Sequence, residues 1–324
     1  MNSFSVIQLG DNRWSEYVAA AHQYDFHHTS CYHQLEKEGE AMLFVAENKG
    51  VFVALPLILR KIENTQYWDC TSAYGYCGPI SNLDFDSVSA ELFAYFRKEL
   101  LNYFKQNPII SAFSRLHPLI FVDELFAGFG KVIAINQTVS IDLRLPIDEQ
   151  RRQFRKSNKS EINQLRGKKG YNVVEAKTEK ELKAFVAIYH ENMERVDASE
   201  NYFFDYQYFY DFINNACFTA KLLLAMKDDE IAAGAIFTAT NTIMQYHLAG
   251  TKRDYIHDTP MKLVLDEARL LGSEIGLHHL HLGGGVGGSD EDSLFRFKAG
   301  FSKERAMYRI WQHIVDQEKY EEVC

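Results

Sequence analysis

The stretch RRQFRKSNKSEINQLRGKKG, residues 151–170, lies near the middle of the 324-residue chain and decides how the rest of it is divided. It carries eight lysine or arginine residues against one glutamate. It contains no proline, and its first glycine is Gly167, so we expect a basic linker helix here. A chain of this length also favours two domains over a single core.

The sequence on either side of this linker repeats one order of elements: strand, helix, long hairpin, helix and strand. The first hairpin turns at residues 48–50, where asparagine and glycine accept positive φ angles, and the second turns at residues 228–229. The repetition predicts an α/β fold with mixed (α+β) sheets in two copies. We expect the first domain over residues 1–147 and the second, with its linker helix, over residues 148–324.

The charge of the chain limits its partners. A net charge of -9 argues against a protein that binds nucleic acid through a broad basic surface, and DNA is not expected as a partner. The basic stretch remains as one local patch. It is either the solvated face of a linker or a surface that binds phosphate groups, and its charge density favours phosphate binding. The candidates for phosphate binding are Arg151, Arg152, Arg155 and Lys156.

The sequence shows no membrane signal and no metal-binding pattern. The N-terminus lacks a basic segment followed by an apolar one, and no apolar run approaches the ~18 residues that span a bilayer. We therefore expect a cytoplasmic protein without membrane insertion. The five cysteines form no CxxC pair, and the histidines near residue 280 have no acidic or thiol companion at ligand spacing, so no metal site is expected.

The glycine-rich segment GGGVGGSDEDS, residues 283–293, has some features of a phosphate-binding loop. A Walker loop needs lysine and then serine or threonine after the glycines, but Ser289 and Asp290 follow here. The spacing of a dinucleotide-binding fingerprint is absent as well. The glycines are therefore expected to permit a tight turn or a close backbone approach, with Ser289 capping the short helix that follows.

Lys298 stands in the stretch FRFKAGF, next to Phe297 and three residues before Phe301. One interpretation is a lysine whose stem covers aromatic rings while its ammonium group stays in water. The other is a partly desolvated ammonium that stabilises an oxyanion or binds a carbonyl or phosphate group. The spacing alone favours neither interpretation.

Two further groups of residues are candidates for a substrate pocket. In TSAYGYCGPI, Tyr74, Tyr76 and Gly78 form either a rigid packed loop or a pocket wall with two phenol groups. In MQYHLAGT, strand alternation places Tyr246 on one face and His247 on the other. A lone histidine on a strand is more often structural, but its pKa also suits an acid or a base.

Several of these stretches together resemble the Fem family of aminoacyl transferases, within a wider set of acyltransferase-like proteins built from two tandem GNAT-type domains. The shared pieces are TSAYGYCGP, the basic helix leading to RGKKGYNV, YHLAG, the helix after Pro260 and, most specifically, FRFKAGF. The likeness covers nearly the whole chain. It implies two tandem GNAT-like domains joined by the basic helix, with a last strand near residues 305–324 that packs back on the first domain.

The resemblance also implies an activity. Members of the family move an activated acyl or aminoacyl group onto an amine of a cell-envelope precursor, such as one of peptidoglycan or polysaccharide. Lys298 would stabilise the oxyanion of the transition state. No tightly bound cofactor is implied, and the donor would be either an aminoacyl-tRNA or an acyl-CoA. The residues implied in substrate binding are Tyr74, Tyr76, Gly78, Tyr208, Tyr246, His247, Phe297 and Phe301.

The chain departs from the family at three points. Members that use nucleotide-linked muropeptides tend to carry tryptophan followed four residues later by lysine, and CYHQLEK here offers Tyr32 and Glu36. They also tend to place arginine four residues before a tyrosine in the second domain, where this chain has Phe204 before Tyr208. Both differences argue against a UDP-linked acceptor. The glycine loop that holds the pyrophosphate of coenzyme A is absent too.

Two alternatives to a Fem-type transferase follow from these departures. One is an acetyl-CoA- or acyl-CoA-dependent enzyme that N-acylates an amino sugar. The other, of a different class, is a catalytically silent tandem GNAT scaffold that binds a glycan or peptide through its aromatic residues. Replacement of Lys298 by alanine distinguishes an enzyme from a scaffold, because the rate of acyl transfer should fall in an enzyme, whereas a scaffold has no such rate.

Overall fold

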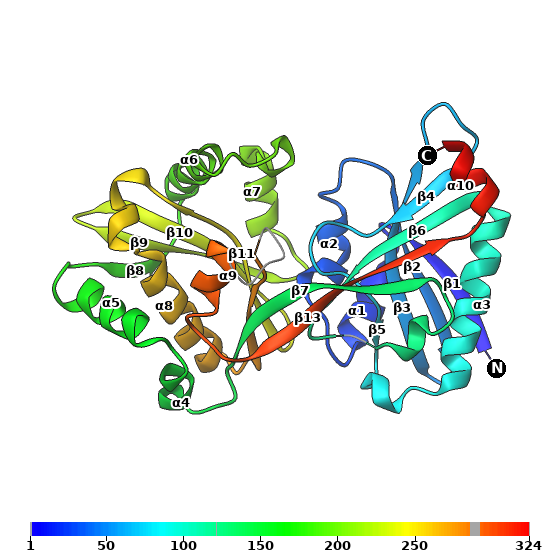
Figure 1. Ribbon diagram of the computed structural model, residues 1–324, viewed down its shortest axis with the longest axis horizontal. Coiled ribbons are helices and arrows are strands. Elements are labelled where there is room, and N and C mark those ends of the chain that lie inside the picture. The colour runs from blue at the N-terminus through cyan, green and yellow to red at the C-terminus, as the bar shows by residue number, and fades with distance from the viewer. Residues whose placement is uncertain (1, 121, 286–291, 324) are drawn as a thin grey trace. The chain divides into compact units, whose positions relative to one another are not determined.

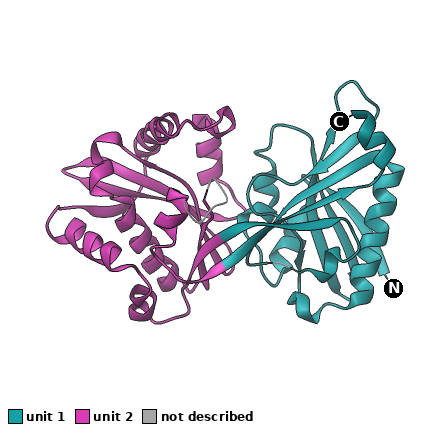
Figure 2. Ribbon diagram, in the orientation of Figure 1, with its two compact units in different colours: residues 1–137, 306–324 teal, residues 138–305 magenta. Residues whose placement is uncertain are grey.

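The computed structural model describes residues 2–120, 122–285 and 292–323. Its chain forms two compact units (Figure 2), the first of Met1–Gln137 with Ala306–Cys324 and the second of Thr138–Arg305. The whole basic stretch thus belongs to the second unit, and the C-terminal segment belongs to the first. No helix among the described residues is both long enough and apolar enough to cross a membrane.

The first unit is built on a sheet whose strands follow the order β1-β2-β3-β4-β6-β13, with the short β5 paired to β3 (Figure 1). Neighbouring strands run antiparallel, except that β4 and β6 are parallel. The strands are β1 (Asn2–Gln8), β2 (Glu40–Asn48), β3 (Val51–Lys61), β4 (Trp68–Thr71), β5 (Ile80–Ser81), β6 (Ile109–Leu116) and β13 (Arg305–Ile314). The helices are α1 (Asn12–Ala20), α2 (Ser30–His33), α3 (Ala90–Gln106) and α10 (Gln317–Val323).

Local sequence explains these elements. At the β2–β3 turn, Lys49 and Gly50 have φ angles of 49° and 79°, the pattern of a two-residue hairpin turn. Ser89 caps the start of helix α3, because its side chain accepts the backbone N–H of Leu92. The apolar side chains of α3 recur at helical spacing and pack into the core of the unit with β2 and β3.

The second unit repeats this plan around strands in the order β7-β12-β11-β10-β9-β8, of which β11 and β12 are parallel (Figure 1). Its strands are the end of β7 (Lys131–Asp142), β8 (Asn172–Glu175), β9 (Thr219–Lys227), β10 (Glu230–Ala239), β11 (Ile243–Thr251) and β12 (His279–Gly283). Its helices are α4 (Ile147–Arg152), α5 (Lys156–Gly167), α6 (Glu179–Arg195), α7 (Tyr206–Ile213), α8 (Met261–Glu274) and α9 (Ser293–Lys298). The predicted α/β fold class with mixed sheets is therefore confirmed.

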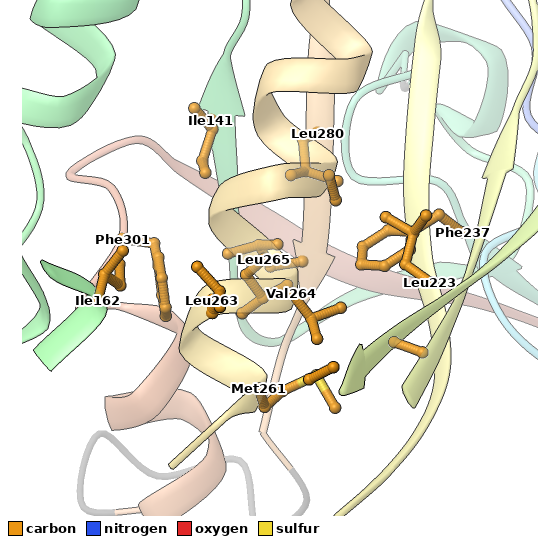
Figure 3. Close-up of a cluster of buried hydrophobic side chains, with 14 of the residues drawn as sticks. Ile141, Ile162, Leu223, Phe237, Met261, Leu263, Val264, Leu265, Leu280 and Phe301 are labelled. Carbon is orange, nitrogen blue, oxygen red and sulfur yellow. The ribbon is translucent and has the colours of Figure 1, made fainter. Parts of the chain in front are cut away.

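The core of the second unit surrounds α8. Figure 3 shows this helix between Ile162 and Phe301 on one side and Leu223 and Phe237 on the other. These side chains are at most 5% exposed. Helix α8 is buried over most of its circumference and packs against both the sheet and helix α5. The chain segment that carries Phe301 is consequently part of the core.

The basic stretch is helical, but in two pieces. Helices α4 and α5 are separated at residues 153–155, where the backbone N–H of Arg155 donates to the carbonyl of Gly300 over 2.8 Å. Gln153 accepts hydrogen bonds from Ser302 and the backbone of Lys303. The break in the helix is thus the place at which a later segment of the chain docks.

Candidate active site

Helix α9 presents Lys298 to the interior of the second unit. Asp292 caps the helix, because its side chain accepts the backbone N–H of Phe295 over 2.7 Å. Phe295 and Lys298 lie about one helical turn apart, and both are buried, with 8% of the surface of each residue exposed. The expected cap Ser289, together with most of the glycine segment, lies outside the described residues.

Within the described part of the chain, a carbonyl oxygen and an aromatic ring lie near the ammonium group of Lys298. Its Nζ donates to the carbonyl oxygen of Gly284 over 2.7 Å and lies 5.6 Å from the centroid of the Tyr246 ring. Burial lowers the pKa of Lys298 to about 8, and the Asp292 carboxylate partly opposes this shift. The group therefore stays mainly protonated at neutral pH while it is desolvated, which is the state that an oxyanion partner requires.

The residues after Lys298 hold α9 against α5. A Cβ atom on Gly300 would lie 2.5 Å from Nδ2 of Asn158, so only glycine fits without a shift of that buried side chain. Phe301 meets the ring of Phe154 edge to face, with centroids 5.1 Å apart, and packs on Phe297 at 5.5 Å. The Phe-Lys-x-Gly-Phe pattern thus supplies the packing that places Lys298.

The aromatic candidates of this unit fall into two groups. Tyr246 joins Lys298, and burial raises the pKa of the Tyr246 hydroxyl far above its usual range, so it remains a neutral phenol. His247 points to the other face of β11 and stacks on Phe212, with ring centroids 4.8 Å apart. Tyr208 stacks on Phe204 at 4.1 Å and on Phe212 at 6.0 Å. Phe204, Tyr208 and Phe212 therefore form one aromatic stack.

The four basic candidates have different surroundings. Arg151 pairs with Asp266 at 2.7 Å, and Asp266 is fully buried. The same carboxylate also pairs with Arg269 and Arg166, at 2.8 and 3.1 Å. Arg151 is therefore a structural ion-pair partner that fixes α4 to α8. Of the four candidates, Arg152, Arg155 and Lys156 are exposed.

In the first unit, two hydrogen bonds to the backbone of Tyr74 fix its position. Its N–H donates to Glu36 Oε1 over 3.2 Å, and its carbonyl accepts the Tyr32 hydroxyl over 2.9 Å. Tyr32 and Glu36 thus fix this loop. The ring of Tyr74 is 45% exposed, whereas Tyr76 is half-buried.

A buried acid and two histidines lie beneath this loop, and the sequence analysis missed them. Asp25 Oδ2 accepts hydrogen bonds from His27 Nδ1 at 3.2 Å and from His117 Nε2 at 3.1 Å. All three side chains are at most 2% exposed. The ring of Tyr76 packs against both imidazoles, with centroids 5.9 and 6.1 Å away. Asp25, His27 and His117 are called the buried acid–histidine cluster below.

The glycines of the loop are required by this cluster. Gly75 has a φ angle of +101°, and a Cβ atom there would overlap the His27 imidazole. Gly78 has a φ angle of +102°, and a Cβ there would lie 3.1 Å from the backbone nitrogen of His117. Gly78 therefore acts in close packing of the loop backbone. Its sequence spacing could not have shown which side chains it approaches.

The buried acid–histidine cluster carries a defined charge. Burial alone would raise the pKa of Asp25, but the hydrogen bonds from His117 and His27 outweigh it and hold that pKa well below its usual range. Burial lowers the pKa of His27. The backbone N–H of Leu119 donates to His117 Nδ1, which leaves Nε2 as the protonated nitrogen of that ring. The cluster is thus one carboxylate that accepts hydrogen bonds from two imidazoles.

Other polar groups add no metal site to this picture. Among the residues that the structure describes, no three histidine, cysteine, aspartate or glutamate side chains are arranged to hold a metal ion. His281 is buried and hydrogen-bonds through Nδ1 to Gln245 over 2.6 Å. Cys70 and Cys77 are buried free thiols.

Comparison with known proteins adds family information to this geometry. Residues 152–298 match the model of the acetyltransferase (GNAT) domain family, and the match ends at Lys298. No curated protein matches the sequence. Among solved structures, FemX is similar over 98% of this chain and 99% of its own, with a TM-score of 0.77 and 13% identity.

Two other solved structures share the arrangement. L-PGS from Bacillus licheniformis is similar over 98% of this chain and 96% of its own, with a TM-score of 0.63 and 14% identity. A tandem GNAT protein from the clavulanic acid biosynthesis pathway is similar over 97% and 99%, with a TM-score of 0.52 and 10% identity. At these identities the likeness shows the fold, which spans the whole chain in each case.

Proposed function

From the premise that this chain has the Fem-like tandem GNAT fold and carries a GNAT acetyltransferase domain, we propose that it is an N-acyltransferase. The enzyme transfers an activated acyl or aminoacyl group to an amine on a cell-envelope precursor, of peptidoglycan or polysaccharide. The observation that supports this proposal most directly is the desolvated ammonium group of Lys298 beside Tyr246.

The proposed reaction needs one stabilised charge and no covalent enzyme intermediate. The acceptor amine attacks the carbonyl carbon of the donor ester or thioester, so an N–C bond forms and the carbonyl oxygen becomes negative. Lys298 donates an N–H to that oxygen, since its bond to Gly284 uses only one of three donors. On collapse, the C–O or C–S bond breaks, and the leaving oxygen or sulfur takes the proton that the amine releases.

The donor is proposed to be an aminoacyl-tRNA, with an acyl-CoA as the second candidate. The exposed cations Arg152, Arg155 and Lys156 favour a polyanionic donor, because each phosphate contact releases counterions and adds affinity. The structural likeness to FemX supports the same choice. An acyl-CoA donor is the second candidate because the chain is also similar to a tandem GNAT protein that was solved without acetyl-CoA.

Donor binding provides the first test. The thermal midpoint of the purified protein is compared with acetyl-CoA, with longer acyl-CoAs and with total aminoacyl-tRNA at matched concentrations. A ligand that binds only the folded state raises this midpoint by mass action. A shift with charged tRNA alone supports the Fem-type enzyme, and a shift with a CoA thioester alone supports the CoA-dependent one. No shift with any donor favours a silent scaffold.

Catalysis by Lys298 provides the second test. With the donor identified, transfer to a pool of muropeptide and amino-sugar acceptors is measured for Lys298→Met, which keeps the length of the side chain but removes its charge. We expect a loss of about 10²-fold or more if the lysine stabilises the oxyanion. Arg296→Met is the matched control, because Arg296 is an exposed cation on the same helix. Equal transfer by both variants removes Lys298 from the mechanism.

A further inference from the structure

Arg115 is a cation of the first unit that the proposed transfer chemistry does not use. It lies on β6, and the strand alternates so that Phe113 and Arg115 share one face while Ala112 and Ser114 face the core. Its guanidinium carbon is 5.2 Å from the centroid of the Phe113 ring and 5.8 Å from that of Tyr74. The charged group is thus placed between two aromatic rings on a half-buried surface.

No carboxylate within the described part of the chain forms an ion pair with Arg115. By contrast Arg13, Arg60 and Arg144 each bind an aspartate through the guanidinium, at 2.6, 2.7 and 2.8 Å. A half-buried arginine without a counter-charge retains most of its capacity to bind an oxyanion, because its five N–H donors form a planar fork. Aromatic neighbours restrict the orientation of that fork and reduce the entropy lost on binding.

The charge of Arg115 acts on the groups around it. Burial raises the pKa of the Tyr308 hydroxyl, and the guanidinium of Arg115 beside it opposes that shift. Tyr308 lies on β13, which pairs with β6 so that Ile310 is opposite Arg115. Tyr308 also packs edge to face on Tyr76 at 5.3 Å. A phenol group therefore stands next to the guanidinium and can donate a second hydrogen bond to the same ligand.

The surroundings of Arg115 are rigid. Its backbone N–H donates to the buried Ser72 hydroxyl over 3.1 Å, and Ser72 begins the loop that carries Tyr74 and Tyr76. Tyr74 is fixed by Tyr32 and Glu36, and Tyr76 rests on the buried acid–histidine cluster. The elements that carry the cation and its neighbours are therefore arranged before a ligand arrives, as a binding site requires.

We propose that Arg115, flanked by Tyr74 and Tyr308, binds an oxyanion, either a carboxylate or a phosphate group. The guanidinium supplies the charge and the forked donors, and the two phenols border the ligand. Under the proposed function, on which this last step rests, the oxyanion is an acidic group of the acceptor precursor. The oxyanion site itself rests only on residues of the first unit.

The test is direct binding without any donor, so its outcome is independent of the transfer reaction. Two probes are titrated by isothermal calorimetry at fixed low salt: inorganic pyrophosphate, and acetyl-alanyl-alanine with its C-terminal amide as the uncharged comparison. The proteins are the full chain, Arg115→Gln, Arg115→Lys and Arg60→Gln. Arg60 serves as the control because it is an arginine of the same unit that already pairs with Asp69.

We expect Arg115→Gln to weaken binding at least about tenfold and Arg60→Gln to leave it unchanged. A carboxylate site binds the dipeptide acid, rejects the amide and is weakened in Arg115→Lys as well, because lysine cannot bind a carboxylate in a forked manner. A phosphate site binds pyrophosphate and tolerates Arg115→Lys. Failure of both probes to bind the unmodified chain, or equal affinities of that chain and Arg115→Gln, overturns the proposal.

Loss of binding has to be separated from loss of folding. The thermal midpoint of each variant is measured without ligand, and Arg115→Lys retains the charge and most of the stem if Arg115→Gln is unstable. Should both variants unfold early, pyrophosphate protection of the Tyr74 loop in hydrogen exchange on the unmodified chain decides the matter. Protection confined to that loop and β6 supports the site, and its absence contradicts it.

Discussion

Nζ of Lys298 and the carbonyl oxygen of Gly284 are joined by a 2.7 Å hydrogen bond across fourteen residues of sequence. The bond ties helix α9 to the end of β12, and the described part of the glycine segment thereby touches the one buried ammonium group on that helix. Gly284 and Lys298, which the sequence analysis treated as parts of two separate candidates, are therefore in direct contact.

The first prediction concerns the pH dependence of transfer. The pKa of Lys298 is lowered to about 8, so its ammonium form, and with it the oxyanion donor, is lost as pH rises through that value. Transfer should therefore decline on the alkaline side with a midpoint near 8. In Lys298→Arg the charge persists, and the decline should vanish even if the maximal rate is reduced. A profile that is identical in both proteins contradicts the role of Lys298.

The second prediction concerns stability and the same lysine. A lysine whose folded pKa lies below its unfolded value binds fewer protons in the folded state between the two values. The free energy of unfolding should therefore rise with pH from about 8 to about 10.4, the usual lysine value. Lys298→Met should lack this rise, while Arg296→Met should keep it. Urea unfolding at several pH values measures the difference.

The third prediction concerns Gly300→Ala. The new Cβ atom would lie 2.5 Å from the Asn158 amide and 3.1 Å from the Phe297 carbonyl, so the unit should lose about 1–3 kcal/mol of stability. The double variant Gly300→Ala with Asn158→Ala makes room and should recover part of the loss. Gly276→Ala is not a suitable control because of its positive φ, whereas Gly167→Ala is, since nothing lies near its Cβ position. Urea unfolding distinguishes the three.

The fourth prediction concerns the buried acid–histidine cluster. Asp25→Asn removes the negative charge that accepts from His27 and His117, and the loss of a buried hydrogen bond to a charged group costs about 1.5–3 kcal/mol. Asp69→Asn breaks the surface pair with Arg60 and should cost less than about 1 kcal/mol. The free energies of unfolding of the two variants test this. Equal losses would show that Asp25 is not held as a buried anion.

The fifth prediction concerns acid. Burial lowers the pKa of His33 to about 4 and that of His28 to about 3. Both are neutral in the fold and bind protons near pH 6.5 when unfolded, so their contribution is full above about 6.5 and is lost as pH falls toward the folded values. His33 Nε2 contacts the His27 carbonyl, and His33→Gln keeps a donor for that oxygen. In this variant the free energy of unfolding, measured by urea unfolding, should fall less between about pH 6.5 and 4. An equal fall in the variant and the unmodified protein contradicts the assignment of His33 as a buried neutral imidazole.

The sequence predicted the parts of the structure that depend on neighbours in the chain. The sequence located both hairpin turns, at residues 48–50 and 228–229. In the first turn the positive φ angles were expected at Asn48 and Gly50, whereas the structure has them at Lys49 and Gly50. The duplicated α/β plan followed from the periodicity on either side of the basic stretch. The break between α4 and α5 was not visible, because it depends on a hydrogen bond from Arg155 to Gly300.

Side-chain partners from distant segments could not be predicted. Asp25 and His27 are only two residues apart, but His117 is 92 residues from Asp25, and only the folded chain brings it to the same carboxylate. Likewise Arg151 was grouped with phosphate-binding candidates because of its neighbours, and its partner Asp266 lies 115 residues further on. The acid at two residues before His27 was a local signal that could have indicated a buried pair.

The docking of Gly300 on Arg155 and Asn158 has a consequence for engineering and for divergence within such proteins. The Phe-Lys-x-Gly-Phe pattern is only half of a structural module, and the other half is the junction of α4 and α5. In a chimaera that exchanges residues 297–302 alone, the segment that carries the lysine would pack against residues 153–158 that do not match it. Exchange of residues 153–158 together with them moves a complete module, so the two segments should vary in concert.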